Sequence, residues 1–209
     1  MVFEDAKNRR FLSMSQSSKH VEWCLNKAKK EIEECKKLGK RPKHRGLLKT
    51  NFDIDEAKKH LAKAEHDFDG ITKFREIGFS DWSMSAGFYC IYHNFLAIAT
   101  KFGYESSNQT CTIALMRFLK ETGKINLDEK FIETLEYHEN LPKADFQDAE
   151  KRKLFVHEKI EESKENSVIE LREDYTYGVQ ITVKDEAKIN QLKEICKELV
   201  DITKEIIYK

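Results

Sequence analysis

The order of apolar and polar residues predicts helices along most of the chain. Apolar side chains recur at helical spacing in residues 17–38, after an N-cap at Asp53 or Asp55, and again near the C-terminus. A further helix is expected to begin with Ser80 as its N-cap and to end at Gly103. This helix directly follows the one capped by Asp53 or Asp55, so the two are expected to form an antiparallel hairpin. The predicted fold class is all-α.

Weaker patterns fill the remaining segments. Residues 108–119 and 128–138 predict two short helices, and residues 144–171 predict a long polar helix with sparse apolar contacts. Alternating apolar residues after a glycine predict an extended connector over residues 175–183. The last helix, residues 185–206, carries apolar side chains at steps of three and four, which is typical of a packing seam.

The helix expected from Ser80 contains a long uncharged stretch. Residues 82–100 include no Asp, Glu, Lys or Arg and are nearly long enough to span a bilayer. They also include polar side chains, among them Tyr92, His93 and Asn94, which favours a buried core helix over a membrane span. The first 12 residues are charged and hold no apolar run, so no secretion signal is expected and the location is predicted to be cytoplasmic.

The charges of the whole chain cancel, but one segment is strongly basic. Lys and Arg number 37 and so do Asp and Glu, so binding to nucleic acid would depend on a local patch. Residues 36–50 hold seven Lys or Arg and no acidic residue. The candidate RNA-binding residues in this segment are Lys40, Arg41, Lys43 and Arg45. The alternative is a solvated loop whose charge only favours solubility.

Neither the cysteines nor the histidines predict a metal site. The five cysteines are scattered and form no CxxC pair, so free thiols in a reducing compartment are expected. His60 and His66 lack the spacing of metal ligands on a helix, and His60 is expected to be solvated. The chain has no motif for a phosphate-binding loop, a hydrolase serine or calcium, so no cofactor and no metal are expected.

Four segments of the chain carry a family resemblance. AKKHLAKAEHDF at residues 57–68 is followed by FYCIYH at residues 88–93. The pattern continues with ESSN at residues 105–108 and LREDYTYG at residues 171–178. Over about residues 54–207 the chain resembles the HEPN domain family, and the order of the segments is more specific than any one of them.

The resemblance implies an up-and-down bundle of four to five core helices, formed by residues 54–209. Residues 1–53 add an N-terminal helix and the basic segment outside the resemblance. The family is linked to RNA cleavage, to toxin–antitoxin and defence systems and to nucleotidyltransferase partners, and its members are commonly dimers. The implied partners are a second copy of the chain, RNA and a nucleotidyltransferase antitoxin, with no membrane.

Catalytic members of the family use an Arg followed a few residues later by a His. Metal-independent RNA cleavage needs a group that takes a proton from a 2′-hydroxyl and returns one to the leaving oxygen, and a cation for the transition state. The matching positions here are Arg172 and, five residues later, Tyr177. A phenol with an ordinary pKa of about 10 is a poor general base. Arg172 is therefore expected to hold a phosphate or an acidic group, while Tyr175 and Tyr177 contribute hydroxyls or stacking.

A second string, Arg152 and His157, is the fallback catalytic pair. Five residues rotate by about 140° on a straight helix, so the pair would act together only between two chains, and a chance match is the alternative. Tyr92 and His93 are the candidate pocket residues. For His93 the alternative is a buried imidazole that is hydrogen bonded to a facing helix.

Three functions remain open for this sequence. The favoured one is an RNA-associated, HEPN-like module whose catalytic status is open. The second is a non-enzymatic scaffold that binds another protein through the seam on residues 189–206 and the exposed long helix. The third is a small-ligand binder between the helices of the bundle.

Overall fold

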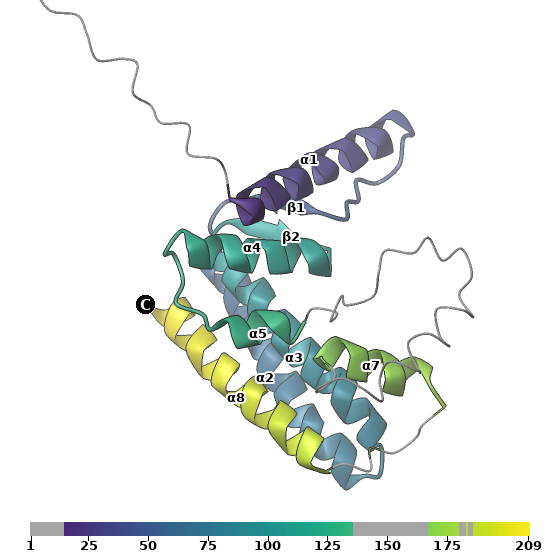
Figure 1. Cartoon of the computed structure of the whole chain (residues 1–209). Helices are drawn as coiled ribbons and strands as arrows, with labels where there is room; N and C mark the ends of the chain where they lie inside the picture. The colour runs from purple at the N-terminus through teal and green to yellow at the C-terminus, as the bar shows by residue number, and fades with distance from the viewer. Residues whose placement is uncertain (1–14, 136–166, 180–182, 184–185) are drawn as a thin grey trace, which may run out of the picture.

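The computed structural model describes residues 15–135, 167–179, 183 and 186–209, and the predicted all-α fold class is confirmed there. The elements in chain order are α1 (Gln16–Lys37), β1 (Leu47–Lys49), α2 (Ile54–Glu76), α3 (Ser80–Lys101), β2 (Tyr104–Ser106), α4 (Gln109–Glu121), α5 (Glu129–Glu133), α7 (Val168–Tyr177) and α8 (Glu186–Tyr208). Figure 1 shows α2, α3 and α8 as a bundle, with α7 against α3 and with α1 at the far end beside α4.

The antiparallel hairpin of α2 and α3 forms the centre of the bundle, as predicted. Asp53 is the N-cap of α2, and its carboxylate accepts a hydrogen bond from the Glu56 N–H at 2.9 Å. The uncharged helix α3 is buried along most of its length because α2, α8, α7 and α4 all contact it. The Ser83 hydroxyl in α3 donates a 2.8 Å hydrogen bond to the Ile71 carbonyl, so this buried polar group is satisfied within the hairpin.

No helix in the described ranges combines the length and apolarity that crossing a membrane requires. The uncharged stretch of α3 instead supplies much of the buried side-chain surface of the bundle. The prediction of a core helix at residues 82–100 is therefore confirmed.

α8 lies along both helices of the hairpin and closes the core. Its buried side chains are those of Ile189, Leu192, Cys196, Leu199, Val200, Thr203 and Ile207. The seam predicted on residues 189–206 is thus used inside the chain, and the prediction that it binds another protein is wrong. The two helices approach closely at Gly87 in α3, where an added Cβ would lie 2.4 Å from Leu192 Cδ2.

α1 joins the bundle through α4 and a short two-stranded sheet. β1 pairs antiparallel with β2, and Leu48 lies opposite Glu105. The buried side chains of α1 include Val21, Cys24 and Ala28. Neither strand was predicted, because three residues are too few for an alternating pattern to stand out.

A disulfide links α1 to α4. Cys24 and Cys111 are 87 residues apart in sequence, and their Cα atoms lie 5.8 Å apart. The prediction of free thiols is therefore wrong for these two residues, whereas Cys35, Cys90 and Cys196 are free. No local pattern marks the pairing, because two helices that are remote along the chain bring the sulfur atoms together. The cysteine pattern consequently no longer argues for a reducing compartment.

The amino end of α3 differs from its prediction. Ser80 is the first residue of the helix, and Phe79 occupies the N-cap position without a side-chain hydrogen bond. The Ser80 hydroxyl instead accepts a 2.9 Å hydrogen bond from the Val183 N–H. A tertiary contact therefore uses the group that the local pattern assigned to capping.

Two predictions for the region around α7 are also wrong. Ser167 and Glu170 form a capping box that starts a helix at this point, so no continuous helix passes through residue 167. The helix then continues to Tyr177, and residues 175–177 are helical rather than extended. The extended prediction rested on the alternating apolar residues after Gly178, and packing of α7 on α3 makes residues 175–177 helical.

Substituting Gly87→Ala tests the close approach of α3 and α8. The new methyl group would overlap Leu192, so the free energy of unfolding is expected to fall by about 1–3 kcal/mol. Gly70→Ala in α2 is the matched control, because its Cβ would meet no atom closer than 3.5 Å and the helix would gain up to about 1 kcal/mol in propensity. Urea unfolding followed by circular dichroism measures both. Equal stability of the two variants would contradict the contact.

Reduction of the disulfide is expected to lower the free energy of unfolding by about 2–4 kcal/mol, since the bond closes a loop across 87 residues of sequence. Urea midpoints with and without dithiothreitol measure this change, with mass spectrometry to verify the oxidation state. Cys35→Ala is the control and should leave the difference intact, because Cys35 is free. Identical midpoints for the oxidised and reduced chains would show that the bond contributes no stability.

Candidate functional site

Arg172 is fixed against the ring of Phe88. It lies in the first half of α7, the helix that packs on α3. Its guanidinium carbon is 4.2 Å from the centre of the Phe88 ring, and 17% of its side chain is exposed. Nη2 lies 3.4 Å from a carboxylate oxygen of Glu173, and the buried Nε has no acceptor among the described residues. The predicted cation is therefore held on the bundle.

The two tyrosines of the same motif are placed differently from Arg172. Tyr175 is partly buried against the core, whereas Tyr177 is 75% exposed at the end of α7. Five residues along a helix correspond to a rotation of about 140°, so Arg172 and Tyr177 do not share a face. The structure does not bring these three predicted residues together into one site.

Tyr92 continues a row of rings that begins at Phe88. The two rings are stacked, with centres 6.0 Å apart and planes 17° from parallel. Burial raises the pKa of the Tyr92 phenol, and a hydrogen bond with the side chain of Thr112 in α4 acts in the opposite direction. The phenol therefore stays protonated near neutral pH and ties α3 to α4.

His93 faces a second imidazole across the α2–α3 hairpin. The Nδ1 atoms of His60 and His93 are hydrogen bonded at 3.3 Å, and the ring planes are 26° from parallel. Both residues are half-buried, and burial lowers the pKa of each imidazole. His93 thus bonds to a facing helix, as its core alternative expected. The prediction that His60 is solvated is wrong, because the hairpin places it opposite His93.

Charged side chains of α2 flank these two residues, which we call the histidine pair. Asp67 is buried; one carboxylate oxygen accepts a hydrogen bond from Lys63, and the other has no partner among the described residues. The Asp67 charge raises the pKa of His93 and that of Lys63 lowers it, while Glu56 raises the pKa of His60. Burial outweighs these effects, so both rings are neutral near pH 7.

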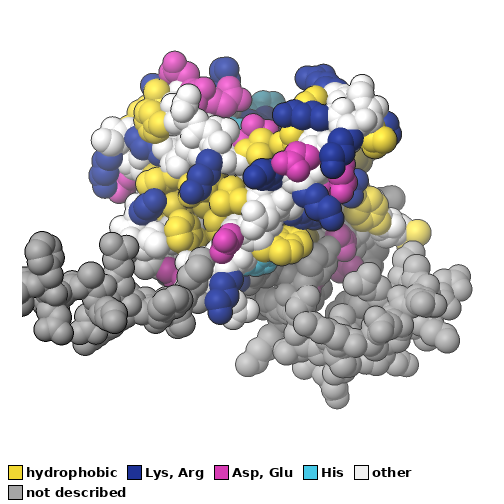
Figure 2. All heavy atoms as spheres, turned by 90° about the horizontal axis from the view of Figure 1, so that it is seen from above, with side chains coloured by type: hydrophobic (Ala, Val, Ile, Leu, Met, Phe, Trp, Pro, Cys, Tyr) yellow, Lys and Arg dark blue, Asp and Glu magenta, His cyan; other side chains and the backbone are white. Residues whose placement is uncertain are grey.

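The basic loop, residues 38–46, presents its four predicted RNA-binding side chains to solvent. Those of Lys40, Arg41, Lys43 and Arg45 are all exposed. Figure 2 looks down on the molecule from above the view of Figure 1, where α1 is uppermost, and shows Lys and Arg side chains across this face with acidic ones among them. The loop itself contains no carboxylate side chain, so its own charge is positive.

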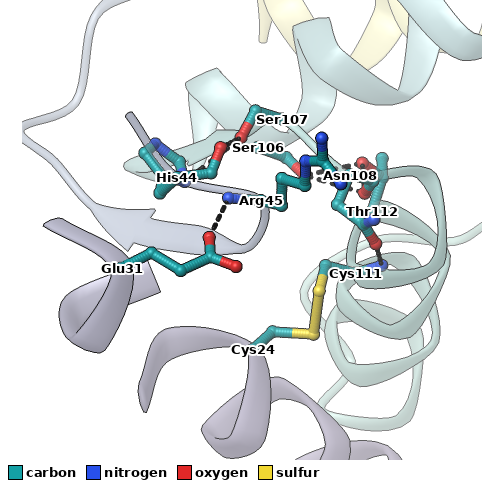
Figure 3. Close-up of a disulfide and its surroundings, with 9 residues drawn as sticks. All are labelled: Cys24, Glu31, His44, Arg45, Ser106, Ser107, Asn108, Cys111 and Thr112. Carbon is teal, nitrogen blue, oxygen red and sulfur yellow. Dashed lines mark hydrogen bonds between the residues drawn. A yellow bond between two sulfur atoms is a disulfide. The ribbon is translucent and has the colours of Figure 1, made fainter. Parts of the chain in front are cut away.

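His44 anchors the basic loop to the turn after β2. Only 7% of its side chain is exposed, and its ring nitrogens lie 3.1 Å from the Ser107 hydroxyl and 3.3 Å from a Glu105 carboxylate oxygen. The Ser107 hydroxyl also donates to the His44 carbonyl at 2.6 Å. Figure 3 shows His44 and Ser107 in the same region as the disulfide. The neighbouring cations of the loop are therefore attached to a fixed backbone.

A second set of contacts anchors the same loop to α1. The Arg45 backbone N–H donates to the Glu31 carboxylate (Figure 3). The Cys35 thiol lies 3.8 Å from the Lys43 carbonyl. Gly46 packs so tightly that an added Cβ would lie 2.4 Å from the Cys24 carbonyl oxygen. The loop is thus held between α1 and β2, and the disulfide Cys24–Cys111 crosses the same region.

The other predicted sites are not supported by the described residues. Arg152 and His157 lie outside them. No group of three or more His, Cys, Asp or Glu within the described ranges is arranged to hold a metal ion. The prediction that no metal is bound stays a prediction, because residues 136–166 are not described.

A hollow beside α4 and α5 bears on the small-ligand alternative. Its lining comprises Arg117, Lys120, Glu121 and Glu129. Lys120 donates a 2.7 Å hydrogen bond to Glu129, which lowers the pKa of that carboxyl, and Arg117 Nε donates to it at 2.9 Å. A lining of paired charges lacks the apolar walls of a typical small-molecule pocket, so this hollow does not favour that alternative.

The structural role of His44 and the pairing of His60 were missed by sequence reasoning. The predicted hairpin could have indicated the second. In an antiparallel hairpin the numbers of facing residues have a constant sum, so a turn at Gly78 places residue 60 opposite about residue 96, within one helical turn of His93. His44 had no comparable signal, because its partners follow α3 and lie about 60 residues away.

Comparisons with known proteins add no identification. No protein-family model matches the chain, and no curated protein matches it. The HEPN resemblance therefore depends on the four segments of sequence described above.

The histidine pair is expected to make stability depend on pH. Because the pKa of each ring is lowered in the folded chain, the unfolded chain binds protons first as the pH falls below about 6.5. Stability should therefore be complete above pH 6.5 and decrease from there towards pH 5. Urea unfolding of His93→Asn should show a shallower slope over this interval than the wild type. Parallel pH profiles for the two proteins would contradict the assignment.

Proposed function

We propose that this chain is an RNA-associated module of the HEPN type that works as a dimer or with a partner protein. The proposal rests mainly on the basic loop. Four of its cationic side chains are exposed, and its backbone is held by contacts with α1 on one side and β2 on the other. Phosphate groups are the dominant source of affinity in nucleic-acid binding, and a fixed array of cations loses less conformational entropy on binding than a free one.

Arg172 supplies a second point for an anionic group in this proposal. Its guanidinium is held over the ring of Phe88 and its side chain keeps 17% of its surface exposed, an arrangement suited to a phosphate oxygen or a carboxylate of a partner. The phenol of Tyr177 is not assigned a catalytic role. The HEPN resemblance adds a toxin–antitoxin or defence setting, a homodimer and a nucleotidyltransferase antitoxin as the proposed partner.

A second candidate function is a protein-binding scaffold without enzymatic activity. The end of the α2–α3 hairpin exposes four large apolar side chains, two in the turn and one in each helix: Ile77, Phe79, Phe74 and Trp82. The rings of Phe74 and Trp82 lie 6.4 Å apart, so part of this set is contiguous. Contiguous exposed apolar side chains are typical of protein-binding surfaces. Between these two functions we favour RNA binding, because the exposed positive side chains of the basic loop suit contact with a phosphate backbone.

Removing the charges of the basic loop tests RNA binding. A variant with Lys40, Arg41, Lys43 and Arg45 all changed to Gln is expected to bind single-stranded RNA more weakly and to have a salt slope smaller by up to about 3, since each phosphate contact contributes about 0.7. Fluorescence anisotropy at several salt concentrations measures affinity and slope.

The matched control removes four exposed cations elsewhere. Lys29, Lys30, Lys188 and Lys197 are changed to Gln, so that both variants have the same net charge. The control should keep most of the wild-type slope. Equal losses in the two variants would contradict a specific role for the basic loop, and a wild-type chain that does not bind RNA would leave the scaffold function.

A further inference from the structure

The histidine pair holds one proton between its two rings. A neutral imidazole has one N–H and one lone-pair nitrogen. Because the two Nδ1 atoms are hydrogen bonded at 3.3 Å, one of them carries the hydrogen and the other accepts it. The donor ring therefore has its lone pair at Nε2, and the acceptor ring has its hydrogen at Nε2. The two Nε2 atoms consequently offer one proton acceptor and one proton donor.

Such a pair can transfer protons without a lasting charge. When the Nε2 lone pair of one ring takes up a proton, the shared proton crosses to the Nδ1 of the other ring, which then releases its own Nε2 proton. Both rings are neutral before and after the transfer. This suits His60 and His93 because burial disfavours the charged form of each. A single half-buried histidine would have to remain an imidazolium between the two steps.

We infer that His60 and His93 are the acid–base centre of an RNA-cleaving site, an inference that rests on the proposed function. One Nε2 takes the proton of a 2′-hydroxyl while the 2′-oxygen forms a bond to the adjacent phosphorus. The bond between phosphorus and the 5′-oxygen breaks, and that oxygen takes the proton from the other Nε2. The products are a 2′,3′-cyclic phosphate and a 5′-hydroxyl, and no co-reactant is consumed.

The surrounding charges fit this chemistry. Lys63 donates a hydrogen bond to Asp67 and influences the pKa of His93, and from this ion pair its half-exposed ammonium supplies a cation for the charge on the phosphorus-centred transition state. Asp67 beside His93 and Glu56 beside His60 place a carboxylate near each ring, which stabilises a proton in transit on either imidazole. The acid, base and cation that the reaction requires thus come from α2 and α3.

The pair also lies towards the end of the hairpin that adjoins the basic loop. His60 is six residues beyond the start of α2, or about 9 Å along the helix axis. β1 ends at Lys49, shortly before α2 begins, and it directly follows the basic loop. RNA bound by the loop is therefore held at the end of the bundle nearer to the histidine pair.

Cleavage of end-labelled single-stranded RNA by the full chain in EDTA tests the inference. The wild type is expected to yield fragments that end in a 2′,3′-cyclic phosphate. His60→Asn and His93→Asn should each slow cleavage by about 10²- to 10⁴-fold, the usual contribution of a general acid or base. His20→Asn is the matched control in α1, outside the hairpin, and should cleave at the wild-type rate. Circular dichroism and urea midpoints establish that the variants fold.

A nitrogen-15 NMR measurement separates a proton relay from a structural contact. Near pH 7 the two rings are expected to be opposite neutral tautomers, one with hydrogen at Nδ1 and one with hydrogen at Nε2. Identical tautomers for His60 and His93 would overturn the relay, even in a chain that is stable and binds RNA.

RNA binding measured on the same proteins separates a failure of the proposed function from a failure of the acid–base centre. A wild-type chain that binds RNA but does not cleave it overturns the acid–base centre and leaves the proposed function standing. A chain that does not bind RNA overturns both. Cleavage that survives His60→Asn and His93→Asn but is lost in Arg152→Ala or His157→Ala assigns the chemistry to the other pair and overturns the inference.

Discussion

Burial of the uncharged helix α3 is the constraint on which the rest of the structure depends. A helix without Asp, Glu, Lys or Arg over residues 82–100 must be covered on most sides, and α2, α4, α7 and α8 provide that cover. Close contact is possible because Gly87 leaves room for Leu192 of α8. The same packing fixes the register of the hairpin, and that register brings His60 opposite His93.

The functional surface is built on a separate anchoring system. α1 contributes little to the central core, but the disulfide to α4, the β1–β2 pairing and the contacts of His44 hold it and the basic loop in place. A chain with balanced charge has no long-range field to attract RNA. RNA binding as proposed would therefore depend on a small number of cations in a defined arrangement, which this anchoring supplies.

The site expected from the family resemblance, at Arg172, and the proposed acid–base centre, at the histidine pair, lie in different places. Arg172 is stacked on α3 from α7, whereas the histidine pair connects α3 with α2. Phe88 and Tyr92 lie on α3 between these groups as a row of stacked rings. Arg172, the cation expected from the family resemblance, therefore suits binding of an anionic group. The two imidazoles suit proton transfer, because together they provide a proton donor and a proton acceptor.

Local sequence determined the helices and many of their ends. The caps at Asp53 and Asn108 and the positive φ of Gly103 depend on residues within about four positions of each other, so the pattern alone could predict them. Only the tertiary structure decided that Cys24 bonds to Cys111, that His60 is not solvated and that the seam of α8 is internal. These outcomes depend on which helices pack together, and residues far apart in sequence meet only when the shared core has formed.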